Sequence, residues 1–172
     1  MSRYSWLSVS YNVPIQPSKN RVYIWRKLKE MGAEYLKHGV AVLPNTHRNL
    51  QNIRTLAAKI KAMGGESCLT ELRFLGEEDE LQLIAAFKRQ SSDEFRELLL
   101  DIARFYEGVS VGDPRKEQLA IRRRYAKARE RDFFGAEEEL DLEGGISELI
   151  ADVKQGSRDL TRWLRQFLPE SK

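Results

Sequence analysis

The sequence predicts an α+β protein in which a small sheet domain, residues 1–76, precedes an all-helical extension, residues 77–172. Two observations predict this division. Strand-like and helix-like apolar patterns alternate up to about residue 76, and no strand-like pattern follows it. The 172 residues can also bury a core without disulfides or metals.

Residues 4–13 alternate apolar and polar side chains, which predicts a strand with one buried face. Prolines 14 and 17 end this strand. A helix is expected next over residues 19–31, with Ser18 as its N-cap and Gly32 at its end. Its apolar stripe is expected to comprise Val22, Ile24, Trp25, Leu28 and Met31.

A short strand at 33–36, a turn at His38-Gly39 and a strand at 40–43 predict a hairpin. Thr46 is expected to cap the second helix, which Gly64-Gly65 terminates, and residues 67–75 predict the last strand. The resulting order is strand, helix, strand, strand, helix, strand. That order is typical of a ferredoxin-like βαββαβ sandwich with two helices on one face of the sheet.

The apolar patterns within the extension predict three helices. Residues 77–106 form one long apolar-striped pattern, with a bend expected near Ser91-Ser92. Pro114 suits the first position of a basic helix that extends to about residue 133. An acidic, glycine-containing loop at 135–145 and an amphipathic helix at 146–168 follow. Such helices are expected to pack as a helical bundle or to offer an apolar face to a second copy.

The composition of the chain indicates its cellular compartment. The single cysteine, Cys68, cannot form an internal disulfide, which suggests a reducing environment, and it is expected to be buried in its strand. No apolar run approaches the length of a signal peptide or of a membrane span. We therefore expect a cytoplasmic protein without a membrane partner. The net charge of +3 argues only weakly for an anionic partner.

The most biased segment is DPRKEQLAIRRRYAKARER, residues 113–131, in which eight Arg or Lys face three acids for a local charge of +5. One interpretation is a phosphate-binding helix, because each neutralised phosphate releases counterions and arginine suits bidentate phosphate contacts. The candidate contact residues are Arg122, Arg123, Arg124, Lys127, Arg129 and Arg131, with Arg26 and Lys29 of the first helix as weaker candidates.

The alternative interpretation is a solvated helix whose arginines pair with the acidic loop or with neighbouring helices. A charge run alone is more often a surface than a binding site. The sequence does not show whether the cations of the different helices share one side of the molecule, so both interpretations stay open.

No catalytic, cofactor-binding or metal-ligating residue is predicted. The chain has no G-x-S-x-G, H-E-x-x-H, P-loop or G-x-G-x-x-G motif. His38 and His47 are too few for a metal site. The protein is therefore expected not to be an enzyme and to need no cofactor.

Five segments carry a resemblance to a known family: LSVSYNVP at 7–14, the 21–29 stretch around WRKLK, GAEYLKHGVAVLPNT at 32–46, GGESCLTELRFL at 64–75 and ERDFFGA at 130–136. Together they resemble the N-terminal domain family of the chromate-resistance protein ChrB. The resemblance implies a chromate-responsive transcriptional regulator that binds DNA, and full-length members carry a second, C-terminal domain. We accordingly expect a homodimer with DNA as its partner, together with a separately encoded partner of the ChrB C-terminal type.

Two other functions stay open. One is a protein-interaction scaffold, in which the helices from residue 77 onward bind a partner and the arginines are structural. The other is a divergent metal-dependent nuclease, because the predicted sheet is similar to small CRISPR-associated subunits used as endoribonucleases or integration scaffolds. The sheet is also similar to the dimerising domain of the phenylacetate-pathway repressor. Asn12 stands where the nuclease family has a metal-binding aspartate, which weighs against that chemistry.

Overall fold

A computed structural model describes residues 4–36, 39–106 and 113–136. The chain divides into two compact units, Met1–Phe87 and Lys88–Lys172. The division falls inside the long third helix, eleven residues beyond the expected boundary at residue 76. The expected loop at 135–145 falls largely outside the described residues, and the expected helix at 146–168 entirely so. No helix in the described part is long and apolar enough to cross a membrane.

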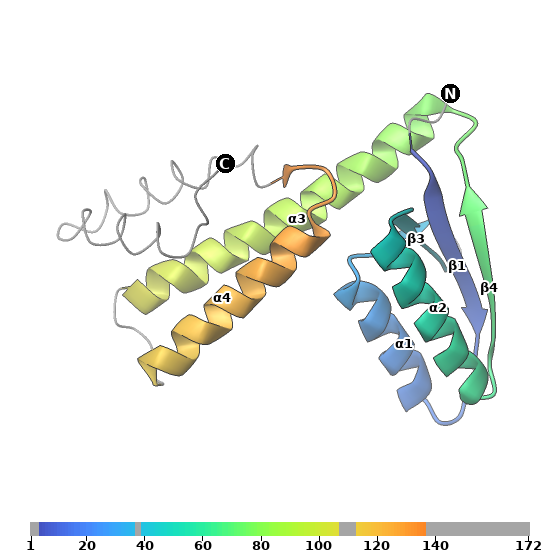
Figure 1. The fold of residues 1–172 in the computed structure, drawn as a ribbon, viewed down its shortest axis with the longest axis horizontal. Helices are drawn as coiled ribbons and strands as arrows, with labels where there is room; N and C mark the ends of the chain where they lie inside the picture. The colour runs from blue at the N-terminus through green and yellow to red at the C-terminus, as the bar shows by residue number, and fades with distance from the viewer. Residues whose placement is uncertain (1–3, 37–38, 107–112, 137–172) are drawn as a thin grey trace. The chain divides into compact units, whose positions relative to one another are not determined.

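The first unit is built on a four-stranded antiparallel sheet with the strand order β2-β3-β1-β4 (Figure 1). Its elements, in chain order, are β1 (Trp6–Asn12), α1 (Lys19–Glu30), β2 (Glu34–Leu36), β3 (Val40–Pro44), α2 (His47–Ala62) and β4 (Glu66–Leu72). The prediction of an α+β fold is confirmed. The short β2 pairs with β3 as the expected hairpin, and β4 ends three residues before the predicted strand does.

Glycine residues end both α1 and α2. Gly32 and Gly64 both adopt positive φ, 76° and 75°, directly after α1 and α2. At the end of α2, the amide of Gly64 donates to the carbonyl of Lys61 and that of Gly65 to the carbonyl of Ile60. This is a Schellman arrangement, which satisfies carbonyls that the helix leaves unpaired. Both glycine stops were predicted correctly.

The two helix starts differ. The Thr46 side chain accepts a hydrogen bond from the amide of Asn49, as predicted for an N-cap. The prediction that Ser18 caps α1 with its side chain is wrong, because Ser18 lies in the helical region (φ −57°, ψ −24°) and makes no side-chain cap bond. A cap residue needs extended backbone to aim its oxygen at the first amides.

The expected apolar stripe of α1 is only partly correct. Ile24 and Leu28 are buried, whereas Val22 and Trp25 are nearly half exposed. The α1 helix lies beside α2, which packs against β1 and β4 through its own buried residues Ile53, Leu56 and Ile60 (Figure 1). A helix flanked on one side by another helix buries a narrow stripe, so side chains at its margin remain in contact with water.

The prediction that β1 has a single buried face is also wrong. All four residues from Trp6 to Val9 are buried. By the pairing register, Trp6 and Ser8 lie on the same face as Pro44 and Val42, and Leu7 and Val9 lie on the opposite face. The first half of β1 is therefore covered on both sides.

The covering on the Trp6 side comes from the start of α3 (Glu77–Tyr106). The Trp6 indole stacks on Phe87 with ring centroids 5.8 Å apart and meets the edge of Phe74 at 6.0 Å. Its Nε1 donates to the Glu80 carboxylate at 2.9 Å, and the Tyr4 amide donates to the same oxygen at 3.2 Å. Glu80 is only 2% exposed, so these donors satisfy a carboxylate that has been removed from water.

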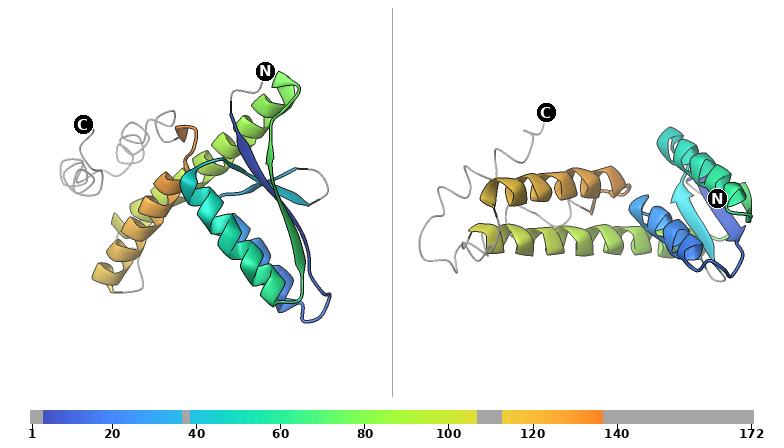
Figure 2. Two further views of the ribbon diagram at one scale, coloured as in Figure 1. Left: turned by 45° about the vertical axis from the view of Figure 1, so that its right-hand side comes forward. Right: turned by 90° about the horizontal axis from the view of Figure 1, so that it is seen from below.

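The second unit contains the rest of α3 and α4 (Pro114–Arg131). Figure 2 shows α4 lying alongside this part of α3. The helix α3 is continuous through Ser91 and Ser92, the place of the expected bend. Pro114 begins α4 as predicted, after Asp113, whose side chain accepts a hydrogen bond from the amide of Arg115.

The buried Glu80 acceptor can be tested directly. We expect Glu80→Ala to lower the free energy of unfolding by about 1–3 kcal/mol, because it leaves the indole and the Tyr4 amide without their shared partner. Glu80→Gln keeps an oxygen acceptor of the same reach and should lose less. Urea unfolding followed by Trp fluorescence measures both variants. Equal losses for Ala and Gln would contradict the role given to the acceptor oxygen.

Close packing at Gly65 generates a second prediction. A Cβ on Gly65 would lie 2.5 Å from Val13 Cγ1 and 2.6 Å from the Asn12 carbonyl oxygen. Gly65→Ala should therefore cost about 2–3 kcal/mol of unfolding free energy by overpacking. Gly39→Ala is the matched control, since it has positive φ but no atom within 4 Å, and should cost about 1 kcal/mol. A Gly65 variant no less stable than the Gly39 variant in urea titrations would refute the packing argument.

Candidate functional site

The candidate site is the basic helix α4, which α3 holds in place through a small apolar seam. Phe95, Leu98 and Ile102 of α3 and Ile121 and Ala128 of α4 form one buried cluster, which we call the Phe95 seam. The rings of Phe95 and Tyr125 lie 6.3 Å apart at a tilted angle within the same seam. These residues recur at helical spacing, so they decide which face of α4 contacts α3 and which faces remain exposed.

Two of the predicted contact residues lie at one margin of this seam and pair with acids of α3. Arg124 hydrogen-bonds the Asp101 carboxylate and lies 3.8 Å from that of Glu97. Arg131 hydrogen-bonds Glu94, and both side chains are largely buried, at 21% and 27% exposure. Arg124 and Arg131 are thus engaged inside the helix pair. This is the pairing with a neighbouring helix that one reading of the sequence anticipated.

Arg129 and Arg122 occupy the other margin of the seam. The guanidinium of Arg129 lies over the Tyr125 ring, 5.9 Å from its centroid. Arg122 is exposed and also interacts with a neighbouring group. Both keep exposed surface, so a ligand could still reach them.

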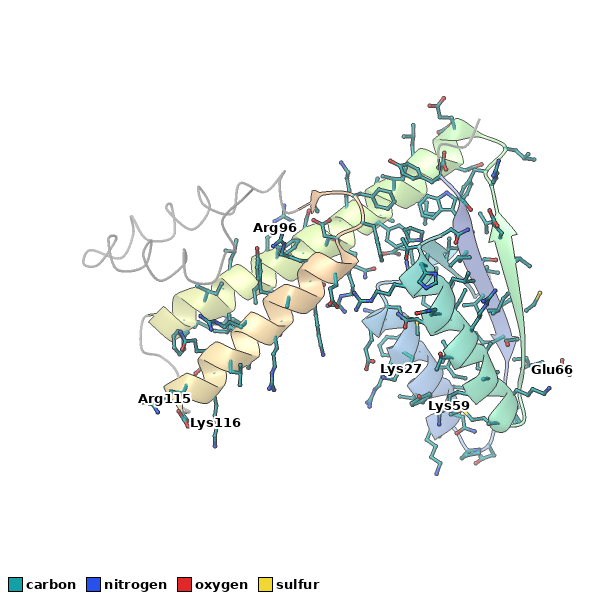
Figure 3. The ribbon with its side chains drawn as sticks, viewed as in Figure 1. Lys27, Lys59, Glu66, Arg96, Arg115 and Lys116 are labelled. Carbon is teal, nitrogen blue, oxygen red and sulfur yellow. The ribbon has the colours of Figure 1, made fainter. Side chains whose placement is uncertain are left out.

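The outward face of α4 carries a row of three cations. Lys116, Arg123 and Lys127 are separated by seven and four residues, which places them along one side of the helix. All three are exposed and form no ion pair within the part of the chain that the structure describes. Figure 3 shows Lys116 pointing away from α3. We call Lys116, Arg123 and Lys127 the outer row.

Sequence reasoning found two of these three residues. Arg123 and Lys127 were among the predicted contacts, whereas Lys116 was counted in the basic run but not chosen. The signal that would have found it is its helical spacing from Arg123, read together with the apolar seam of Ile121 and Ala128 on the opposite side.

The two weaker candidates, Arg26 and Lys29, belong to α1 in the first unit. Arg26 is exposed, and the Lys29 ammonium lies over the Trp25 ring, 5.4 Å from its centroid. The structure therefore groups the six α4 candidates on one helix and places Arg26 and Lys29 in a different unit.

Residues 4–36, 39–106 and 113–136 contain no cluster of three or more His, Cys, Asp or Glu that could hold a metal ion. The expectation that Cys68 is buried is wrong, because its side chain is exposed. Cys68 lies on the edge strand β4, on the face that it shares with Ser10, where the covering by α3 does not extend.

One family model matches residues of both units of the chain. Residues 21–166 match the family model described as "Protein ChrB, N-terminal". A curated protein named "Protein ChrB" from Cupriavidus metallidurans is 27% identical over 134 residues, which cover 76% of this chain. The match spans 40% of that relative's length. No solved structure matches the chain significantly.

A largely buried ion pair between α3 and α4 and an exposed ion pair within α3 predict different losses of stability when the arginine is removed. Arg131→Met should lower the free energy of unfolding by about 1–2 kcal/mol, because it leaves the largely buried Glu94 carboxylate unpaired. Arg96→Met is the control, since Arg96 pairs with Asp93 on the exposed surface of α3, and its loss should stay within about 0.5 kcal/mol. Urea unfolding followed by far-UV circular dichroism compares them. Equal stability of the two variants would mean that Arg131 does not hold α4 on α3.

Proposed function

Because this chain belongs to the ChrB N-terminal family, associated with chromate resistance, we propose that it is a non-enzymatic DNA-binding module that regulates transcription. The match spans only 40% of the length of the curated relative, so an activity of that whole protein is only proposed for this chain. The function is carried by α4, and the observation that supports it is the outer row.

The outer row suits a polyanion for three physical reasons. Its cations are exposed and not neutralised by described acids, so a phosphate would not have to displace an existing partner. They stand on a helix that the Phe95 seam holds in place, which reduces the ordering cost of binding. Arg122 and Arg129 add charge along a neighbouring side of the same helix. Lys and Arg in such a row contact phosphates, which adds affinity and makes it depend on salt.

We also infer that the first unit is a ferredoxin-like domain that acts as a homodimer. The element order and the antiparallel strand order β2-β3-β1-β4 support the fold assignment. A dimer would present two copies of α4, and dimeric binders commonly read paired half-sites on DNA.

An interaction scaffold is the second candidate, and a specific observation favours it. Arg124 and Arg131 are tied to α3, as expected if the arginines of α4 are structural. Exposed Leu100 on α3 and Leu119 on α4 also leave apolar surface in this unit for a protein partner.

A DNA titration separates the two candidates. We expect the triple variant Lys116→Glu, Arg123→Glu, Lys127→Glu to bind duplex DNA at least about tenfold more weakly, and to flatten the slope of log K against log salt by up to about 2.7, that is about 0.9 for each lost phosphate contact. Fluorescence anisotropy would be measured with the protein's own upstream DNA and a scrambled duplex, at several salt concentrations, with and without chromate.

The matched control is Lys59→Glu, Lys61→Glu, which reverses two exposed cations in the last turn of α2 (Figure 3 labels Lys59). The control should bind DNA with nearly unchanged affinity. Wild-type affinity in the triple variant, or an equal loss in the control, would remove the outer row from the interface and favour the scaffold.

A further inference from the structure

The α1 helix presents an apolar surface that the fold leaves about half exposed. Its buried residues are Ile24 and Leu28. Val22 and Trp25, one turn apart, remain 45% and 46% exposed. A large aromatic side chain in water is unfavourable by the apolar area that it exposes, and Trp is enriched where proteins bind one another.

Two cations lie on the same side of α1 as this apolar surface. Arg26 and Lys29 follow Val22 at the fourth and seventh positions, so Val22, Trp25, Arg26 and Lys29 share one helix face. We call these four residues the α1 face. The Lys29 ammonium over the indole, 5.4 Å from its centroid, favours an ordered Trp25 ring before any partner arrives.

The charge of the α1 face is not neutralised by α1 itself. Glu30 is the one acidic residue in α1, and it accepts a hydrogen bond from Lys27 at 2.6 Å. That hydrogen bond raises the pKa of Lys27, as expected for an ammonium held by a carboxylate. Because Glu30 pairs with Lys27, α1 supplies no further acid to Arg26 or Lys29, both of which are exposed.

We propose that the α1 face is a docking site for an acidic amphipathic helix of a protein partner. Such a helix would lay its apolar row over Val22 and Trp25 and direct its carboxylates toward Arg26 and Lys29. Duplex DNA fits less well, because Val22 and Trp25 would be pressed against hydrated phosphates. A lipid surface fits less well, because two half-exposed side chains give little apolar area to insert. The site is separate from the outer row and does not depend on DNA binding by α4.

The test uses two synthetic peptides of identical composition. One has Leu at helical spacing with Glu on its flanks, and the other has the same residues shuffled so that the spacing is lost. Each is labelled with a fluorophore and titrated with the full chain by anisotropy. We expect the patterned peptide to bind at least about tenfold more tightly than the shuffled one, because only the patterned peptide matches apolar and charged groups at once.

Variants identify the surface. Trp25→Ala and Val22→Ser keep every charge and should each weaken the patterned peptide about tenfold, whereas Lys59→Glu, Lys61→Glu should leave its affinity unchanged. The α4 triple variant should also bind the peptide normally, which separates this proposal from DNA binding. Both test residues are half exposed, so folding should be retained. Circular dichroism checks this, and if one variant misfolds the other decides.

Three results would overturn the proposal. Equal binding of both peptides would show charge attraction without a docking site. Normal peptide binding by both Trp25→Ala and Val22→Ser would show that the peptide sits elsewhere. Loss of DNA affinity in Trp25→Ala and in Arg26→Glu, with no peptide binding by the wild type, would show that the α1 face contacts nucleic acid instead.

Discussion

The burial of Trp6 is the constraint on which the first unit depends. The indole occupies the end of β1 where the covering on the second face of the sheet begins, and it needs both an aromatic neighbour and a hydrogen-bond acceptor there. Phe87 supplies the first and Glu80 the second, and both come from the opening turns of α3. The start of α3 is therefore part of the sheet domain's core, which explains why the compact units divide within α3 and not before it.

In the second unit the Phe95 seam has the corresponding role. It fixes which face of α4 contacts α3, and so decides which cations of α4 pair with α3 and which are exposed. Arginines at one margin of the seam meet the carboxylates of α3 and hold the two helices together. Cations on the opposite side are exposed and form no ion pair with the described residues. One basic segment thus contains both a structural set and an accessible set, so the pairing with a neighbouring helix that the sequence suggested holds for only part of the segment.

The two exposed basic surfaces differ in chemistry. The outer row on α4 consists of cations one or two turns apart, which suits a regularly charged polymer. The α1 face combines two cations with Val22 and Trp25, which suits a partner that offers both acids and apolar side chains. If both proposals hold, the chain would bind DNA through one surface and a protein through the other, and so would bring that protein to DNA.

Local chemistry determined most of the elements of this protein from its sequence alone. The Thr46 cap, the glycines that end α1 and α2, Pro114 at the start of α4 and the charge of α4 all depend on residues within a few positions of one another. Only the tertiary structure decided which faces are buried. Trp6 meets Glu80 across 74 positions, so the alternation in β1 could not reveal that both its faces are covered. The exposure of Trp25 and the division of the α4 cations were likewise set by which helix packs beside which, and single-helix periodicity carries no information about that.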